Sequence, residues 1–199
     1  YLKMKLISLL SLLTCGPAEL ETQKTDTQSK AVEEIPTEFG VIAAEDCSQA
    51  SVGSTACNIV LYDQNKDVWQ LKNQKDKIVV LDFSAMWCGP CQHAGSFTQT
   101  IQDSYSNVIM ATILIDGYYS GIEPTEEEIN AWVSNHGITT APVLYASREK
   151  IFDSTGTGLD GYIITGFPTY AYIDTDGKIQ YMHTGFNELY VRNIIEGLQ

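Results

Sequence analysis

Two cysteines three positions apart, Cys88 and Cys91, are the residues of this sequence best suited to chemistry. They lie in the segment Trp87-Cys88-Gly89-Pro90-Cys91, and at a helix start this spacing brings two cysteines within disulfide reach. Unpaired amide groups and the positive end of the helix dipole favour a thiolate there, so we expect the pKa of Cys88 to lie below that of a free thiol. Cys91, one turn further along, would be better buried. The pattern predicts thiol–disulfide exchange.

Other uses of a CxxC pattern fit the sequence less well. A zinc site usually needs a second pair of ligands, and the chain has neither a second CxxC nor two histidines at ligand spacing. A haem attachment site needs histidine directly after the second cysteine, but Gln92 stands there and His93 follows one position late. We therefore expect no metal and no cofactor. His93 is interpreted as an exposed residue of the first helical turn, with modulation of the thiolate as the alternative.

Hydrophobic patterning places the elements around this pair. The continuous apolar run 78–83 predicts a buried central strand before the cysteines, and residues 108–115 predict a second one. Between them, residues 92–105 have helical spacing of their apolar side chains. Residues 58–62 and 68–71 predict two shorter strands joined by a turn upstream.

The second half of the chain continues this alternation. Thr125 and Glu128 form a capping-box pattern at the start of a helix, and the acidic residues there are interpreted as capping rather than metal binding. The remaining predicted elements are an extended segment from 141, a hairpin of 169–173 and 179–183, and a last helix capped by Asn187. This order predicts an α/β domain whose central sheet is mixed.

The segment Asp82-Phe83-Ser84-Ala85-Met86-Trp87-Cys88-Gly89-Pro90-Cys91 resembles the active-site signature of the thioredoxin superfamily. Gly166-Phe167-Pro168-Thr169, which opens the late hairpin, resembles the cis-proline loop of the same family. The resemblance covers residues 58 to 199 and implies a thioredoxin fold, a central mixed β-sheet flanked by helices. The N-terminal β-hairpin extension and the long segment 116–165 resemble the TlpA-like branch of exported, membrane-tethered members.

The resemblance also implies roles for individual residues. Cys88 would be the nucleophile, Cys91 the resolving thiol, and Asp82 a buried carboxylate that helps to deprotonate Cys91. Pro168 would be the cis-proline that faces the cysteines, with Pro142 as the competing candidate. The substrate would contact neighbouring residues, namely Trp87, Gly89, Pro90, Phe167 and Thr169. In the alternative interpretations, Asp82 reaches solvent at a sheet edge and Trp87 only packs in the core.

The sequence departs from the family pattern near the expected carboxylate. In relatives, the position of Ser84 is commonly a tryptophan, and the position of Met86 is commonly an acidic or small residue. Thr112 stands about where cytosolic thioredoxins have a buried lysine. Without this lysine, the sequence does not predict how far the pKa of Asp82 is shifted.

Residues 1–15 resemble an export signal. Lys3 and Lys5 precede the apolar run 6–13, which is far shorter than the ~20 residues that span a bilayer. Leu12-Leu13-Thr14-Cys15 resembles the lipobox of bacterial lipoproteins, so Cys15 is the expected lipidation site, although Thr14 is unusual there. Ordinary cleavage and a core helix are the alternatives. Residues 16–38 are polar and predict a flexible tether, and residues 39–199 predict the folded domain.

The remaining cysteines and the charge bear on the compartment and the partners. Cys47 and Cys57 are expected to form a structural disulfide in an exported protein, with two unrelated thiols as the alternative. The formal net charge of −13 argues against nucleic-acid binding, because such a chain repels phosphate backbones.

These inferences lead to one preferred function and several alternatives. The preferred one is an extracytoplasmic thiol–disulfide oxidoreductase that reduces protein disulfides and draws electrons from a membrane donor. Its lipid anchor would hold it at the periplasmic or extracytoplasmic face of a bacterial membrane. Gly89-Pro90 between the cysteines resembles reducing thioredoxins. A disulfide oxidase or isomerase on the same fold is the main alternative. A thiol peroxidase and a non-catalytic lipoprotein binding module are weaker ones.

Overall fold

The computed structural model describes residues 40–42, 50–152 and 161–199. All of them belong to one compact unit, residues 35–199. The predicted signal with Cys15, the tether, Cys47 and residues 153–160 of the long segment 116–165 lie outside the described residues. Within the described ranges, no helix combines the length and the apolar character needed to cross a bilayer.

Two sheets and four α-helices make up the described part of the chain. The small sheet contains β1 (Gly40–Ile42), β2 (Asn58–Tyr62) and β3 (Val68–Gln70), followed by a 3-10 helix, Leu71–Asn73. The central sheet contains β4 (Ile78–Ala85), β5 (Val108–Asp116), β6 (Val143–Tyr145), β7 (Thr169–Ile173) and β8 (Ile179–Thr184). The helices are α1 (Gly89–Ser104), α2 (Glu126–Asn135), α3 (Arg148–Ile151) and α4 (Glu188–Gly197).

The central sheet has the strand order β6-β5-β4-β7-β8. β5 pairs in parallel with β4 and β6, whereas β7 pairs antiparallel with β4 and β8. β4 is therefore the middle strand, and all eight of its residues are buried. This position explains its continuous apolar run in the sequence, because a strand covered on both faces has no solvent side. The prediction of a mixed central sheet is confirmed.

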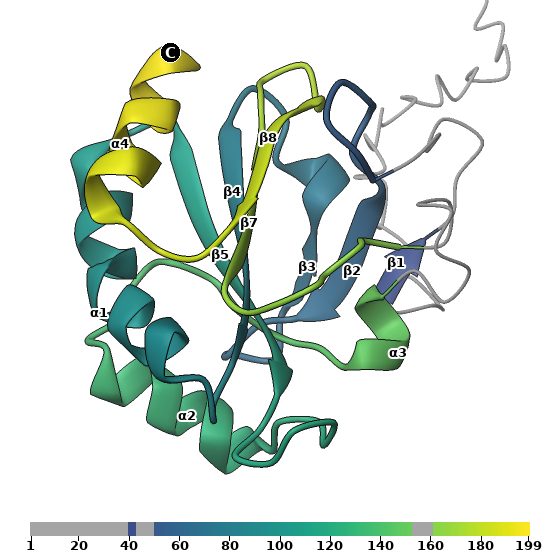
Figure 1. Cartoon of the computed structure of the whole chain (residues 1–199), viewed down its shortest axis with the longest axis vertical. Coiled ribbons are helices and arrows are strands. Elements are labelled where there is room, and N and C mark those ends of the chain that lie inside the picture. The colour runs from purple at the N-terminus through teal and green to yellow at the C-terminus, as the bar shows by residue number, and fades with distance from the viewer. Residues whose placement is uncertain (1–39, 43–49, 153–160) are drawn as a thin grey trace, which may run out of the picture. The chain divides into compact units, whose positions relative to one another are not determined.

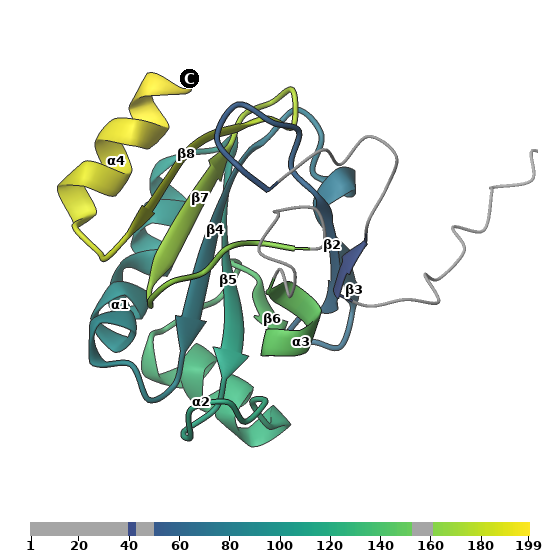
Figure 2. The ribbon, with the colours of Figure 1, turned by 45° about the vertical axis from the view of Figure 1, so that its right-hand side comes forward.

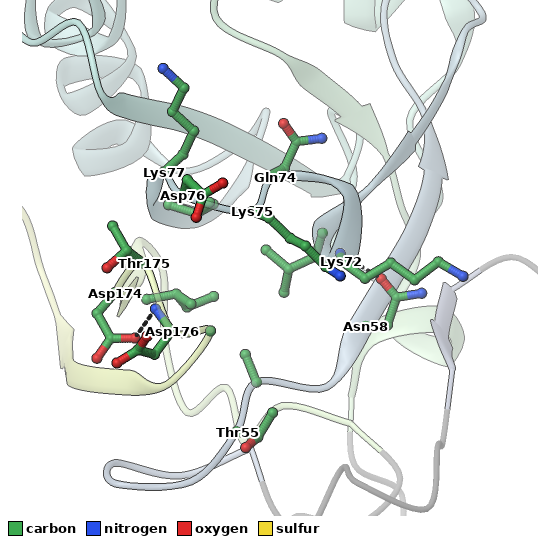
Figure 3. A pocket seen from close by; sticks show the side chains of 15 residues that line it. Thr55, Asn58, Lys72, Gln74, Lys75, Asp76, Lys77, Asp174, Thr175 and Asp176 are labelled. Atoms are coloured by element: carbon green, nitrogen blue, oxygen red, sulfur yellow. Dashed lines mark hydrogen bonds between the residues drawn. The ribbon is translucent and has the colours of Figure 1, made fainter.

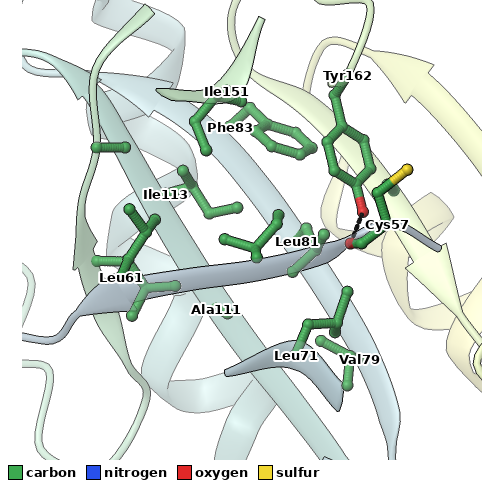
Figure 4. Packing of buried hydrophobic residues seen from close by; sticks show 14 of the residues in the cluster. Cys57, Leu61, Leu71, Val79, Leu81, Phe83, Ala111, Ile113, Ile151 and Tyr162 are labelled. Carbon is green, nitrogen blue, oxygen red and sulfur yellow. Dashed lines mark hydrogen bonds between the residues drawn. The ribbon is translucent and has the colours of Figure 1, made fainter. Parts of the chain in front are cut away.

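The two faces of the central sheet are covered by different elements (Figures 1 and 2). α1, α2 and α4 lie on one face, and the small sheet and α3 lie on the other. Under the small sheet, Leu61 packs in one apolar cluster with Leu81 and Ile113 of the central strands (Figure 4). Tyr162 lies in the same cluster and donates its hydroxyl hydrogen to the carbonyl of Cys57 at 3.1 Å. These contacts hold the small sheet on the central one.

On the opposite face, Gly95 lets α1 approach α2 closely. A Cβ at this position would lie 2.8 Å from His136 Cδ2 and 2.9 Å from Trp132 Cζ2. Trp132 is fully buried between these helices and the sheet. The packing of α2 therefore requires a residue without a side chain on this turn of α1.

The predicted order of elements is confirmed, including the capping box of Thr125 and Glu128 and the cap at Asn187. The differences concern element ends and short elements. α1 begins at Gly89 rather than at Gln92, because Cys88 is its N-cap, and the predicted strand 68–71 ends one residue early. β1 makes the N-terminal hairpin a three-stranded sheet, and α3 is a single turn. Neither was predicted, since segments of three or four residues have no resolvable hydrophobic period.

Candidate active site

Cys88 and Cys91 lie together at the start of α1 and are joined by a disulfide. Their Cα atoms are 5.2 Å apart. The amide of Cys91 donates a hydrogen bond to Cys88 Sγ at 3.2 Å, so the sulfur caps the helix. Cys88 is 3% exposed and Cys91 is fully buried, which makes Cys88 the sulfur nearer to solvent. Gly89 and Pro90 are exposed beside them.

The turn that carries Cys88 is fixed by hydrogen bonds on both sides. The amide of Met86 donates to the carbonyl of Asp116 at 2.9 Å, and the amide of Cys88 donates to the carbonyl of Ala85 at 3.2 Å. From α1, the side-chain amide of Gln92 donates to the carbonyl of Met86 at 2.7 Å. The dithiol segment is therefore anchored to β5 and to its own helix.

Asp82 lies in the middle of β4 and is 2% exposed, so the interpretation of an edge residue that reaches solvent is wrong. Its Oδ1 accepts a hydrogen bond from the hydroxyl of Ser84 at 2.7 Å. Burial, only partly offset by hydrogen bonding to Ser84 and Tyr170, raises the pKa of Asp82 to about 7. A carboxyl group of this acidity can exchange a proton near neutral pH.

Thr112 is the register partner of Asp82 on β5. Its hydroxyl oxygen and Asp82 Oδ2 are both buried and have no hydrogen-bond partner within the described residues. A threonine supplies no positive charge to stabilise the ionised carboxylate. The departure from the family pattern at Thr112 thus agrees with the raised pKa of Asp82.

The Phe167–Pro168 peptide is the one cis bond among the described residues, as the resemblance predicts, whereas Pro142 follows a trans bond. Phe167 packs against the apolar cluster that contains Cys88 and Cys91. The side chain of Thr169 is buried, and its hydroxyl donates to the carbonyl of Gly166 at 2.7 Å. The loop before β7 is thereby closed on itself next to the dithiol.

Trp87 lies at the surface beside the dithiol with 44% of its area exposed, so it is not simply a core residue. Its ring meets Phe167 edge to face, with centroids 5.9 Å apart. Its indole N–H donates to Asp116 Oδ2 at 3.0 Å. The sequence interpretation did not include Asp116, although a carboxylate at the end of a buried strand beside β4 was an available signal.

Two other predicted features stand apart from this site. His93 is exposed and contacts the rings of Phe97 and Phe186. Cys57 is buried and disulfide-bonded. Because Cys47 lies outside the described residues, its pairing with Cys57 stays a prediction.

A cavity of 410 Å³ lies at the opposite end of β4 from the dithiol (Figure 3). The segments before β4 and after β7 line it with both lysine and aspartate side chains, including Lys72, Lys75, Asp174 and Asp176. Its described lining contains none of the predicted site residues. The candidate active site is therefore the dithiol end of the sheet.

Comparison with known proteins includes the segment that carries the dithiol. Residues 59–150, which include the dithiol, match the thioredoxin family model. The thiol-disulfide oxidoreductase ResA of Bacillus thuringiensis (strain Al Hakam) is 27% identical over 134 residues, or 67% of this chain and 70% of that protein.

Shorter and structural matches agree with this. The thioredoxin of Ictalurus punctatus is 48% identical over 48 residues, which are 23% of this chain and 45% of that thioredoxin. The chain thus spans about half the length of the first curated relatives that it matches. Among solved structures, the pneumococcal exposed lipoprotein thioredoxin (Etrx1) of Streptococcus pneumoniae strain TIGR4 is 26% identical with a TM-score of 0.54, over 71% of this chain and 99% of that one.

Proposed function

Because residues 59–150 match the thioredoxin family model and the chain has the thioredoxin fold, we propose that it is a thiol–disulfide oxidoreductase of the thioredoxin superfamily that works through Cys88 and Cys91. The observation that carries the proposal is the Cys88–Cys91 disulfide at the start of α1, which follows the strand that carries the buried carboxyl group of Asp82 and lies beside the Phe167–Pro168 loop. Such a pair accepts two electrons when it opens to two thiols and returns them when it closes.

In the reducing direction, the reaction begins with the open dithiol. The Cys88 thiolate attacks one sulfur of a substrate disulfide, so that a bond forms between Cys88 and the substrate while the substrate S–S bond breaks. The departing substrate sulfur takes up a proton. The amide of Cys91, at 3.2 Å, and the dipole of α1 favour the thiolate of Cys88 before the attack.

The second step releases the substrate. The Cys91 thiol gives its proton to the carboxylate of Asp82 and attacks Cys88 Sγ, so that the Cys88–Cys91 bond forms and the bond to the substrate breaks. The second substrate sulfur leaves and takes up a proton. The substrate has then gained two electrons from the dithiol and two protons from the solvent, while the proton of Cys91 is held on Asp82. A carboxyl group with a pKa of about 7 can accept this proton near neutral pH and later return it.

The substrate would lie across the exposed surface around Cys88. Trp87, Gly89 and Pro90 are exposed there, and Phe167 is half-buried beside them. The backbone next to Pro168 would pair with an extended substrate segment by strand addition. The hydroxyl of Thr169 already donates to the carbonyl of Gly166.

We further propose that the protein acts outside the cytoplasm as a reductase of protein disulfides. Gly89-Pro90 between the cysteines, the signal-like residues 1–15 with a lipid on Cys15, and the tether 16–38 support this proposal. The pneumococcal relative is named an exposed lipoprotein, which is consistent with a membrane anchor here. A reductase in this place requires a membrane electron donor.

The first test of the activity is the reduction of insulin disulfides with dithiothreitol as electron source. Cys88→Ser should abolish the catalysed rate and leave urea unfolding close to that of the reduced wild type. If Cys88→Ser still catalyses the reduction of insulin, the proposal is refuted. If the wild type shows no catalysed rate and Cys88→Ser is much less stable than the wild type, the pair is purely structural.

The direction of electron flow is tested by thiol trapping across defined redox buffers. A potential near about −270 mV, the value of thioredoxin, supports a reductase. A potential near about −120 mV, the value of DsbA, would replace the reductase by an oxidase at the same site.

A further inference from the structure

Five side chains from four segments form a closed ring beside the dithiol: Trp87, Asp116, Arg148, Phe152 and Phe167. We call this set the five-residue ring. Arg148 and Phe152 both belong to the α3 segment. Two of its members, Trp87 and Phe167, flank Cys88 and the Pro168 loop. Arg148, on α3, lies at the far side of the ring.

The ionic half of the ring is a forked pair. Arg148 Nε donates to Asp116 Oδ1 at 2.9 Å, and Arg148 Nη2 donates to Asp116 Oδ2 at 2.6 Å. The Asp116 side chain is fully buried, and that of Arg148 is 42% exposed. Asp116 Oδ2 also accepts the indole N–H of Trp87. The arginine thus fixes both oxygens of the carboxylate that orients the tryptophan.

Electrostatics agree with this geometry. Although burial alone would raise it, the pKa of Asp116 is lowered by the hydrogen bonds from Arg148, Gly121 and Trp87 and by the charge of Arg148. Asp116 is therefore ionised at neutral pH and remains an acceptor for Trp87.

The aromatic half of the ring connects the same arginine to the proline loop. Arg148 Cζ lies 5.7 Å from the centroid of the Phe152 ring. Phe152 contacts Phe167 with centroids 6.4 Å apart, and Phe167 contacts Trp87 at 5.9 Å. The guanidinium group of Arg148 thus contacts both Asp116, the partner of Trp87, and Phe152, the partner of Phe167.

We propose that Arg148 is a positioning residue of the active site, which holds Trp87 through Asp116 and Phe167 through Phe152. It acts on the site through these two partners, and its further hydrogen bond, from Nη2 to Ser120 Oγ at 2.9 Å, lies outside the ring. The consequence for substrates rests on the proposed function: a protein disulfide that must lie across Trp87 and Phe167 depends on Arg148, whereas a small disulfide that needs only Cys88 does not.

The position of Trp87 can be measured without any activity. The chain has three tryptophans, so the oxidised, ¹⁵N-labelled full chain gives three indole N–H signals, and Trp87→Phe identifies the one from Trp87. Arg148→Met should move the Trp87 signal, and Arg148→Lys should move it too, because an ammonium group cannot form the fork. Lys150→Met is the matched control, since Lys150 is on the same helix, and its ion pair with Glu123 at 3.6 Å lies outside the ring.

The kinetic readout separates positioning from general damage. Arg148→Met should lower kcat/KM for insulin by about tenfold and leave the rate with the small disulfide 5,5′-dithiobis(2-nitrobenzoate) within about twofold of wild type. Lys150→Met should change neither. If Arg148→Met does not fold, Arg148→Lys must give the signal shift and a smaller selective loss with insulin.

The outcomes that overturn the proposal are distinct. An unmoved Trp87 signal in both arginine variants, or equal losses with insulin and the small disulfide, would refute a positioning role. If the wild type reacts with neither disulfide, the proposed function fails, while the indole signal still decides whether Arg148 positions Trp87.

Discussion

Asp82→Asn should make the oxidised protein more stable at alkaline pH and leave its stability unchanged in acid. In the folded state burial raises the pKa of Asp82 from 3.8 to about 7. The folded protein therefore holds a proton between these pH values that the unfolded chain has already released. By linkage, the contribution of Asp82 to stability is fully present below about pH 4 and is lost as the pH rises through about 7.

The size of this loss follows from the two pKa values. A tenfold change in acidity corresponds to about 1.4 kcal/mol, so the full loss between pH 4 and pH 8 is about 4 kcal/mol. Asparagine cannot ionise, and its amide oxygen can still accept the hydrogen bond from Ser84. The variant should therefore unfold with a free energy close to that of the wild type at pH 4 and about 4 kcal/mol higher at pH 8.

Urea unfolding of the disulfide-bonded protein at several pH values from 4 to 8 measures this difference without adding salt. Asp67→Asn is the control, because it removes the same charge from an exposed loop. A gap between wild type and Asp82→Asn that does not grow with pH, or that also appears in the control, would refute the argument that burial sets the acidity of Asp82.

Three other variants test the site and the packing around it. Cys91→Ser should trap a mixed disulfide between Cys88 and a protein substrate, visible by non-reducing electrophoresis, because no thiol remains to displace the substrate; a variant that releases the substrate would contradict the assignment of Cys91. Gly95→Ala should lower the free energy of unfolding in urea by about 1–3 kcal/mol, since its Cβ would lie 2.9 Å from Trp132. Thr125→Ala should cost about 1 kcal/mol in the same assay through loss of the capping box. An unchanged urea midpoint would contradict the packing argument for Gly95→Ala or the capping argument for Thr125→Ala.

Two buried carboxyl groups on adjacent central strands have opposite properties here. Asp82 lies among neutral groups, and burial raises its pKa to about 7. Asp116 meets the guanidinium group of Arg148, and its pKa falls below the usual value. The first can exchange a proton near neutrality and the second keeps its charge, so one is suited to proton transfer and the other to orienting Trp87.

Local sequence was sufficient for the parts of this protein that depend on near neighbours along the chain. The run 78–83 predicts a buried strand because β4 has no solvent-facing side. The helical spacing after Cys91 and the pattern Thr125-x-x-Glu128 predict α1 and α2, because caps and helical periods involve residues within a few positions of one another. The CxxC spacing indicates the dithiol for the same reason, and the proline before β7 was identified by resemblance.

Only the tertiary structure shows what surrounds these residues. Asp82 and Thr112 become neighbours through the register of β4 and β5, and that register leaves the carboxylate without a basic partner. Arg148 is one of two arginines in the chain and has no local pattern around it. It reaches Asp116, 32 positions away, only after α3 has packed beside the end of β5. Acidity and side-chain orientation depend on groups that are close in space, and distances between remote segments are set by the packing of the whole sheet rather than by any short stretch of sequence.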